Sequence, residues 1–453
     1  MEKRYMETLL SQIREKRARE PVRQEISNHI KDQKERYIAD GMTEEEAEKQ
    51  AVTDMGDPVE TGMALDQIHR PKPAWGMLAV IAFLCAAGVI LQYAVYAANK
   101  SSDMGAYYVQ KQCIYSILGF FLLCGIYLID YTRIAKYSRY LCFAILLFLF
   151  LIGSDLSSLI QLPFLYDNSL VRIFGHWISI HIFFYLYLPL YGAVLHSYRG
   201  CTMQNLWKVM LYTLLPIFFA FRLAHLSACI NIFVIVAVMF CTAAAKGWFP
   251  LHVIHLPRAG ALQGKKGIWL ILPVFLALFM LIIKNQPLYQ YHRLQAWLNP
   301  KAYRATAGYV ENIIRDTIST SQLIGKNTNP SITDLLLHAE TDYLLTYLIA
   351  TFGILAAAAL ITLMILLSAK LLSVSIRQKN QLGMLMGLGC SLSFILQSAE
   401  YILVNLSLLP TSSLYLPLVS FGGSGMLQTC ILLGMLLSIY RYENVVSEPV
   451  PAH

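Results

Sequence analysis

Residues 415–427 read YLPLVSFGGSGML and open the last of ten long apolar stretches in the chain. Two adjacent glycines and two serines interrupt a run that otherwise suits a lipid bilayer. Small residues let helices approach closely, and glycine lets the backbone lie next to a cavity. This stretch therefore predicts either close helix packing or the wall of a binding site at the start of the last helix.

Composition indicates a membrane protein. Of the 453 residues, 56% are hydrophobic and only 14% are charged, against about 25% in an ordinary soluble domain. Most basic residues outside the first 70 fall in short loops that would face the cytoplasm, which explains the net charge of +8 without nucleic acid. We therefore expect an all-α, multi-pass membrane protein of about ten transmembrane helices. The apolar stretches are 76–97, 112–129, 138–153, 180–197, 206–221, 225–244, 267–284, 342–370, 382–408 and 416–439.

The first 70 residues differ from the rest of the chain because they are polar and rich in acidic residues. Apolar residues at three- and four-residue spacing predict a small helical bundle, with a capping box at Thr43 and Glu46 and helix ends at Gly41 and Gly56. The segments EISNHI and ADGMTEEEAEKQAVTDMGDP resemble a HAAS-type permease prefix domain, which implies a cytoplasmic accessory module. We divide the chain into this prefix, a linker, a membrane domain and a cytoplasmic tail: 1–70, 71–75, 76–445 and 446–453.

The loop at 285–341 is long, and its many aromatic residues argue against disorder. Four motifs occur in it and at its end: YQYHRLQAWLNP (289–300), GY (308–309), LIGK (323–326) and ETDY (340–343). Together with LPLVSFGGSG (416–425), they resemble the motifs of the SEDS family (shape, elongation, division and sporulation), which includes FtsW, RodA and SpoVE. The resemblance spans residues 75 to 445 and implies a location in the bacterial cell membrane. The basic residues of the short loops predict that both termini lie in the cytoplasm.

The resemblance implies a peptidoglycan glycosyltransferase that polymerises lipid II, an undecaprenyl-diphosphate-linked disaccharide peptide, during division, elongation or sporulation. Such chemistry needs a base near the acceptor hydroxyl and cations beside the diphosphate. By position, Asp342 matches the family's catalytic aspartate, and Arg293 and Lys326 are candidates for the diphosphate. The other substrate-binding candidates are Tyr289, Gln290, His338, Glu340, Ser420, Gly422, Gly423 and Ser424.

The resemblance also implies partners: lipid II, membrane lipids and a class B penicillin-binding protein, but no nucleic acid. A divalent cation such as Mg²⁺ or Mn²⁺ at the diphosphate fits the charge of the substrate. No cluster of metal ligands in the sequence specifies such a site, and the nine cysteines form no CxxC pair.

Each candidate also has a structural interpretation. An aspartate such as Asp342 at the start of a helix often stabilises only the helix N-terminus. Basic residues in an outer loop are often solvated or contact lipid phosphates. Glu400 lies inside the ninth apolar stretch, where a lipid-facing carboxylate costs at least about 2.5 kcal/mol. Glu400 must therefore face the interior, either as a cavity-lining group or in a hydrogen bond to Gln397 or a tyrosine.

Three departures from the family pattern keep other functions open. His338 and Glu340 occur in swapped order, a Gln-Pro-Ser-Glu segment is missing before the fourth helix, and Ala224 and His225 replace a Pro-Asp pair. A catalytically degenerate scaffold or regulator of cell-wall synthesis is therefore one alternative. A flippase for lipid-linked precursors, which would need a polar path across the membrane, is another.

Overall fold

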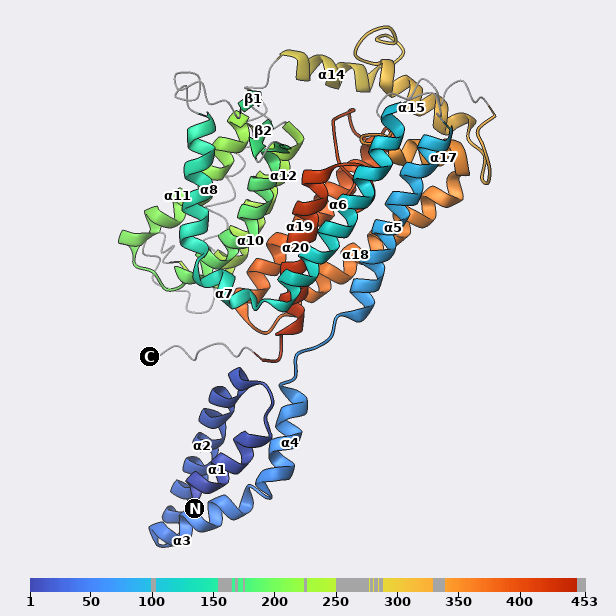
Figure 1. Ribbon diagram of the computed structural model, residues 1–453. Helices are drawn as coiled ribbons and strands as arrows, with labels where there is room; N and C mark the ends of the chain where they lie inside the picture. Colours follow the sequence, from blue (N-terminus) through green and yellow to red (C-terminus); the bar gives the residue numbers. More distant parts are fainter. Residues whose placement is uncertain are drawn as a thin grey trace. The chain divides into compact units, whose positions relative to one another are not determined.

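The structure is a computed structural model (Figure 1). Contacts divide the chain into two compact units. The first unit comprises Met1–Ala74, Gln378–Gly383 and Ile439–His453, and the second comprises Trp75–Arg377 and Met384–Ser438. The described residues are 1–98, 103–153, 165–167, 170–173, 176–223, 226–249, 277, 280, 284, 288–328 and 339–445.

The N-terminal part of the first unit is a four-helix bundle. Its helices are α1 (Glu2–Gln12), α2 (Lys16–Ala39), α3 (Glu44–Asp54) and α4 (Pro58–Ile68). Leu9, Ile13 and Ile30 are buried at its centre, as the apolar spacing predicts. The chain turns at Gly41 and Gly56, whose φ angles of +94° and +78° favour glycine. The predicted helical bundle and both predicted helix ends are thus present in the structure.

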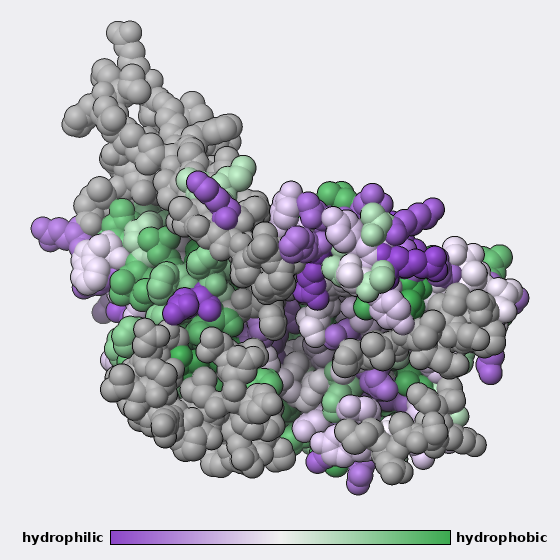
Figure 2. All heavy atoms as spheres, turned by 90° about the horizontal axis from the view of Figure 1, so that it is seen from above, coloured by the Kyte–Doolittle hydropathy of each residue, from purple (hydrophilic) through white to green (hydrophobic). Residues whose placement is uncertain are grey.

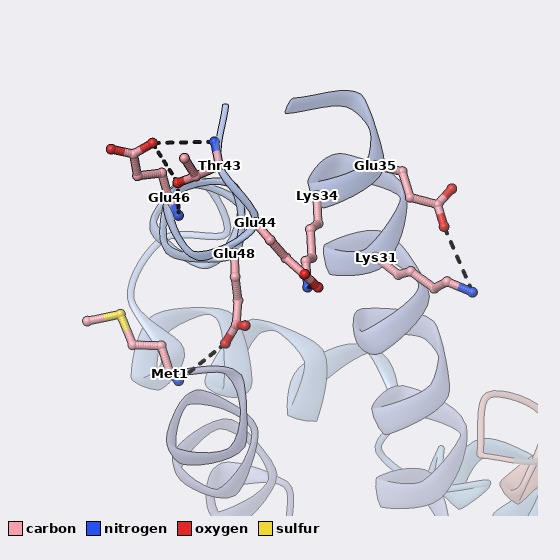
Figure 3. Close-up of polar contacts among 8 residues, drawn as sticks. All are labelled: Met1, Lys31, Lys34, Glu35, Thr43, Glu44, Glu46 and Glu48. Atoms are coloured by element: carbon pink, nitrogen blue, oxygen red, sulfur yellow. Dashed lines mark hydrogen bonds and ion pairs between the residues drawn. The ribbon is translucent and has the colours of Figure 1, made fainter. Parts of the chain in front are cut away.

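The predicted capping box at the start of α3 is confirmed. The backbone N–H of Glu46 donates to Thr43 Oγ1, and the backbone N–H of Thr43 donates to the Glu46 carboxylate (Figure 3). On the neighbouring helix, Lys34 Nζ lies 2.8 Å from Glu44 Oε1, which ties α2 to α3. Short-range sequence signals therefore suffice to define this part of the chain.

The apolar helices agree with the predicted membrane domain. Among the described residues, seven helices are long and apolar enough to cross a membrane, and α8 is a shorter apolar helix. Every predicted apolar stretch contains a helix except 267–284, which lies almost wholly outside the described residues. The helices are α5 (Trp75–Ala98), α6 (Asp103–Leu128), α7 (Tyr131–Lys136), α8 (Ser138–Gly153), α10 (His181–Ser197), α11 (Met203–Leu223), α12 (Leu226–Ala245), α17 (Leu344–Phe352), α18 (Ile354–Ile376), α19 (Gln381–Asn405) and α20 (Gly423–Arg441).

Glycines allow several of these helices to approach closely. α8, α10, α11 and α12 pack against one another, and α5 packs beside α6 (Figure 1). A Cβ at Gly389 of α19 would lie 2.9 Å from the carbonyl carbon of Leu188 in α10. A Cβ at Gly434 of α20 would lie 2.9 Å from the carbonyl oxygen of Leu123 in α6. Small residues thus set the spacing of α19 and α20 against the other helices.

The predicted stretch 342–370 is broken into α17 and α18 at Gly353, whose φ is +96°. The LIGK segment of the long loop lies against this break. The backbone N–H of Gly325 donates to the carbonyl of Phe352, and the N–H of Asn327 donates to that of Ala350. The segment therefore holds α17, which follows the ETDY motif, against the loop.

A small antiparallel sheet, which the sequence analysis did not anticipate, precedes α10. Its strands are β1 (Leu165–Asp167), β2 (Leu170–Ile173) and β3 (His176–Ser179), in that order. Leu170 pairs with Ser179 across β2 and β3. Strands this short give no periodic signal that a sequence could reveal.

The long loop contains two described helices, α14 (Leu288–Leu298) and α15 (Tyr309–Thr320). α15 is amphipathic, with Ile313 and Ile314 buried and Asp316 half exposed. Hydrophilic side chains gather on part of the face seen in Figure 2, which looks down onto the end of the molecule where α14 and α15 lie. The described part of the loop, residues 288–328, is therefore folded, as its aromatic content predicts.

Candidate active site

Asp342 is held at the start of α17 by two residues of α19. The Tyr401 hydroxyl donates to the carbonyl of Thr341 and accepts from the backbone N–H of Leu344. Asn405 Nδ2 donates to the carbonyl of Asp342 over 2.9 Å. Tyr401 and Asn405 are both fully buried, so the backbone around Asp342 has little freedom to move.

The Asp342 carboxylate lines a cavity. Ser413 Oγ donates to Asp342 Oδ2 over 2.9 Å, and both residues lie on the wall of a cavity of about 490 Å³. The same wall includes residues from the sheet and from α10, α12, α19 and α20. Its polar side chains, apart from those two, are Ser179, His181, Tyr185, Ser227, Thr341, Gln397, Glu400, Tyr415, Ser424 and Gln428.

The GGSG segment divides its residues between this cavity and helix packing. Gly422, Ser424 and Gly425 line the cavity. A Cβ at Gly423 would instead lie 2.7 Å from the Tyr115 ring of α6. Ser420 is fully buried, and its Oγ accepts from the backbone N–H of Leu416 over 2.8 Å. The segment therefore contributes both to a cavity wall and to close packing.

A second cavity, of about 790 Å³, contains Arg293 on its wall. Three residues line both cavities: Ser227, Glu400 and Ser413. The Asp342 carboxylate in the first cavity and the Arg293 guanidinium in the second suit a ligand with a reacting hydroxyl and an anionic group. Arg293 also shows that the loop helix α14 contributes to the cavity walls.

Glu311 of α15 fastens the segment that carries Ser413. Its carboxylate accepts from Ser407 Oγ over 2.9 Å and from the backbone N–H of Thr411 over 2.7 Å. Arg315 Nε donates to the same Ser407 hydroxyl, and Trp297 Nε1 donates to the Ser407 carbonyl. We call Glu311, Arg315, Trp297, Ser407 and Thr411 the loop clamp, because together they tie both loop helices to the chain that follows α19.

The loop clamp is expected to weaken as pH rises. Burial raises the pKa of the Glu311 carboxyl, although hydrogen bonds from Ser407 and Thr411 and the nearby Arg315 and Arg293 oppose this effect. A carboxyl whose pKa is higher in the folded state contributes stability that is present below its unfolded pKa of about 4.3. That contribution is lost as pH rises through the raised pKa.

Hydrogen exchange of α15 in the full chain measures this effect as an opening free energy, which we expect to fall as the pH rises from about 4.3 through the raised pKa of Glu311. Glu311→Gln cannot titrate, so its opening free energy should lose this dependence. An unchanged slope in the variant would contradict the assignment to Glu311.

The other predicted site residues lie elsewhere or outside the described part. Lys326 does not line either cavity and lies beside the break at Gly353. Glu340 does not line them either; its carbonyl accepts from Gln92 Nε2 and from the backbone N–H of Phe421. His338 and the side chains of Tyr289 and Gln290 lie outside the described residues, as do Ala224 and His225.

Sequence reasoning missed several residues of the cavity walls. Ser413 follows α19 in the segment PTSSLY, whose run of hydroxyl residues before an apolar motif was the available signal. Asn231 lies within α12, where a lone amide in an apolar helix was a second signal. Glu400 was predicted to face the interior, and the structure confirms this, because it lines both cavities.

These features define a class of protein: a multi-pass membrane protein with a polar cavity under a folded loop. The comparison with protein families shows to which family the chain belongs. Residues 75–445 match the family model of FtsW, RodA and SpoVE, described as cell cycle proteins. The chain belongs to this family, which confirms the resemblance seen in its motifs.

Two relatives and two solved structures illustrate the match. The "Probable peptidoglycan glycosyltransferase FtsW" of Xanthomonas oryzae is 24% identical over 400 residues, which cover 86% of this chain and 76% of that protein. The protein of the same name from Coxiella burnetii is 31% identical over 162 residues, which are 34% of this chain and 44% of the relative.

A structure described as "Structural coordination of polymerization and crosslinking by a peptidoglycan synthase complex" aligns with a TM-score of 0.58 at 20% identity, over 82% of this chain and 98% of that one. A variant of the rod shape determining protein RodA from Thermus thermophilus aligns with a TM-score of 0.52 at 16% identity, over 81% and 97%. At these identities the structural likeness establishes the fold alone, and it confirms the predicted all-α, multi-pass architecture.

Proposed function

We propose that this protein is a peptidoglycan glycosyltransferase that polymerises lipid II into glycan strands. The observation that carries the proposal is the cavity in which Asp342, positioned by α19 and hydrogen-bonded to Ser413, meets Gly422, Ser424 and Gly425. Family membership and the names of the relatives support the same activity. A cavity open near the ends of the helices suits a substrate whose headgroup is polar and whose tail stays in lipid.

The reaction follows from the chemistry of the groups. Asp342 accepts the proton of an acceptor sugar hydroxyl, whose oxygen attacks the anomeric carbon of a second lipid-linked sugar. The new C–O bond forms as the bond from the anomeric carbon to the phosphate oxygen breaks, and undecaprenyl diphosphate leaves with the electron pair. Ser413 holds the Asp342 carboxylate in place by donating to Oδ2 over 2.9 Å.

Arg293 is the residue proposed to stabilise the leaving diphosphate. It lies on the wall of the second cavity, half-buried, and its planar guanidinium matches the geometry of phosphate oxygens. Lys326 is also proposed to contact the diphosphate, but it would have to reach the substrate from the segment beside Gly353. Arg293 therefore carries more of this proposal than Lys326.

A divalent cation such as Mg²⁺ or Mn²⁺ stays a proposal. Among the described residues, no three His, Cys, Asp or Glu side chains form a cluster that could hold a metal ion. A cation at the diphosphate would therefore take most of its ligands from phosphate oxygens and water, a mode in which Mg²⁺ is often bound. The described residues supply no metal site of their own, and the mechanism above uses no metal step.

A class B penicillin-binding protein is proposed as the partner. We further propose that both termini lie in the cytoplasm. Residues near both ends of the chain meet in the first unit. Lys72 Nζ lies 2.8 Å from Glu443 Oε2, and Gln378 Nε2 donates to the carbonyl of Ile439. This arrangement supports placing the start of the chain, its end and the loop before α19 on one side of the membrane.

A lipid II polymerisation assay in liposomes tests the function. We expect the purified wild-type chain to form glycan strands, and a class B penicillin-binding protein to increase their rate of formation. Absence of glycan strands in both conditions would contradict the proposed glycosyltransferase activity. It would favour the non-catalytic scaffold, an alternative that the replacement of the Pro-Asp pair supports. Transfer of lipid II between leaflets without polymerisation would instead identify a flippase.

A further inference from the structure

Glu400 forms a polar site for which the motifs of the sequence gave no role. It lies on α19, and its carboxylate accepts from Asn231 Nδ2 of α12 over 2.6 Å. Ser227, also on α12, lines the same two cavities as Glu400. Asn231 Nδ2 lies 3.5 Å from the Tyr185 hydroxyl of α10, so three helices meet at this point. Burying a carboxylate among apolar helices is unfavourable, which makes its presence informative.

Glu400 lies between Asp342 and Arg293, the two groups that the proposed reaction requires. Asp342 lines the smaller cavity only, and Arg293 lines the larger one only. Glu400 lines both, as does Ser413, which donates to Asp342. A ligand that reaches from the base to the guanidinium therefore passes Glu400.

The chemistry of a carboxylate decides which part of the ligand it contacts. An ionised carboxylate only accepts hydrogen bonds, and it has about four acceptor sites, of which Asn231 occupies one. The others are available to O–H and N–H donors in the cavities. A diphosphate offers no such donors and is repelled by a like charge. Sugar hydroxyls and acetamido N–H groups fit, whereas the diphosphate does not.

We propose that Glu400 binds the sugar headgroup of the lipid-linked substrate through its O–H or N–H donors and excludes the diphosphate from the centre of the two cavities. This inference rests on the proposed function for the identity of the substrate. Glu400 thereby orients the sugar toward Asp342 and directs the diphosphate toward Arg293. Asn231 is a positioning residue that fixes the carboxylate through its hydrogen bond.

If Glu400 and Asn231 had only a structural role, their variants would behave differently from those of a sugar-binding residue. A buried polar pair can often be replaced by apolar residues without loss of stability, whereas removal of one partner leaves the other unsatisfied. Glu400→Leu alone should therefore destabilise the protein, and Glu400→Leu with Asn231→Leu should recover thermal stability. If Glu400 binds sugar, the double variant recovers stability but not substrate binding.

Two probes with the full-length protein in micelles test this: labelled lipid II and labelled undecaprenyl diphosphate. We expect the Kd for lipid II to rise about tenfold in both variants, the loss of one hydrogen bond to a charged group. The Kd for undecaprenyl diphosphate should not rise, because that probe carries no sugar and loses only the repulsion of a like charge. Ser393→Ala is the matched control, since Ser393 is a buried residue of α19 that bonds only within its helix and lines neither cavity.

Recovery of lipid II binding in the double variant together with its stability would overturn the proposal and leave a structural pair. An equal change in the Kd values of both probes would overturn it as well. Because binding is measured without turnover, these results stand apart from the polymerisation assay. Failure of the wild-type chain to polymerise lipid II refutes the proposed activity but leaves the sugar contact open to this measurement.

Discussion

Asp342→Asn is expected to abolish glycan polymerisation while the protein still inserts and folds. Asparagine is nearly the same size and keeps an acceptor for Ser413, but it cannot take a proton from the acceptor hydroxyl. General base catalysis contributes about 10²- to 10⁴-fold, so the rate of strand formation should fall by at least about a hundredfold. The measurement is the initial rate of polymerisation of lipid II, with thermal stability followed in parallel.

Asp316→Asn provides the matched control for this experiment. Asp316 belongs to α15 of the same loop, and its exposed carboxylate lies 3.4 Å from Arg304. A surface ion pair of this kind contributes about 0–1 kcal/mol, so its loss should leave polymerisation unchanged. Wild-type rates in the Asp342→Asn protein would exclude Asp342 as the base.

Gly88→Ala is expected to damage the active site from a distance. A Cβ at Gly88 of α5 would lie 2.6 Å from the carbonyl oxygen of Val419 and 3.0 Å from that of Leu418. The atoms in the way are backbone, and Leu418 already has a positive φ of +69°, so the segment has little room to adjust. We expect a loss of about 1–3 kcal/mol of stability. The displaced Gly422–Gly425 wall should also lower the polymerisation rate.

Gly125→Ala in α6 isolates the steric effect. Nothing lies within 4 Å of a Cβ at Gly125, so the substitution adds a methyl group without a clash. Alanine favours a helix over glycine by about 0.5–1 kcal/mol, and this control should be neutral or slightly more stable. Equal melting temperatures for the two variants would show that the approach of α5 to the Leu418–Val419 backbone is looser than the distances indicate.

The sequence by itself determined the class of protein, the family and the main candidate for catalysis. Hydropathy is summed over some 20 residues and depends little on how helices rotate, so apolar stretches locate helices without knowledge of packing. The capping box at Thr43 is equally local, because its partner lies three residues away. Asp342 was found through a motif of adjacent residues, which also needs no tertiary information.

Only the tertiary structure decided which side chains face the cavities. Ser413 bonds to Asp342 across 71 residues, Glu311 to Thr411 across 100, and Glu400 to Asn231 across 169. Such pairs depend on the rotation and spacing of packed helices, which no local pattern encodes. The same holds for the GGSG segment, where the rotation of one helix start places Ser424 in the cavity and Gly423 against Tyr115. Local sequence motifs identify the candidate residues, and helix packing determines which residues each of them contacts.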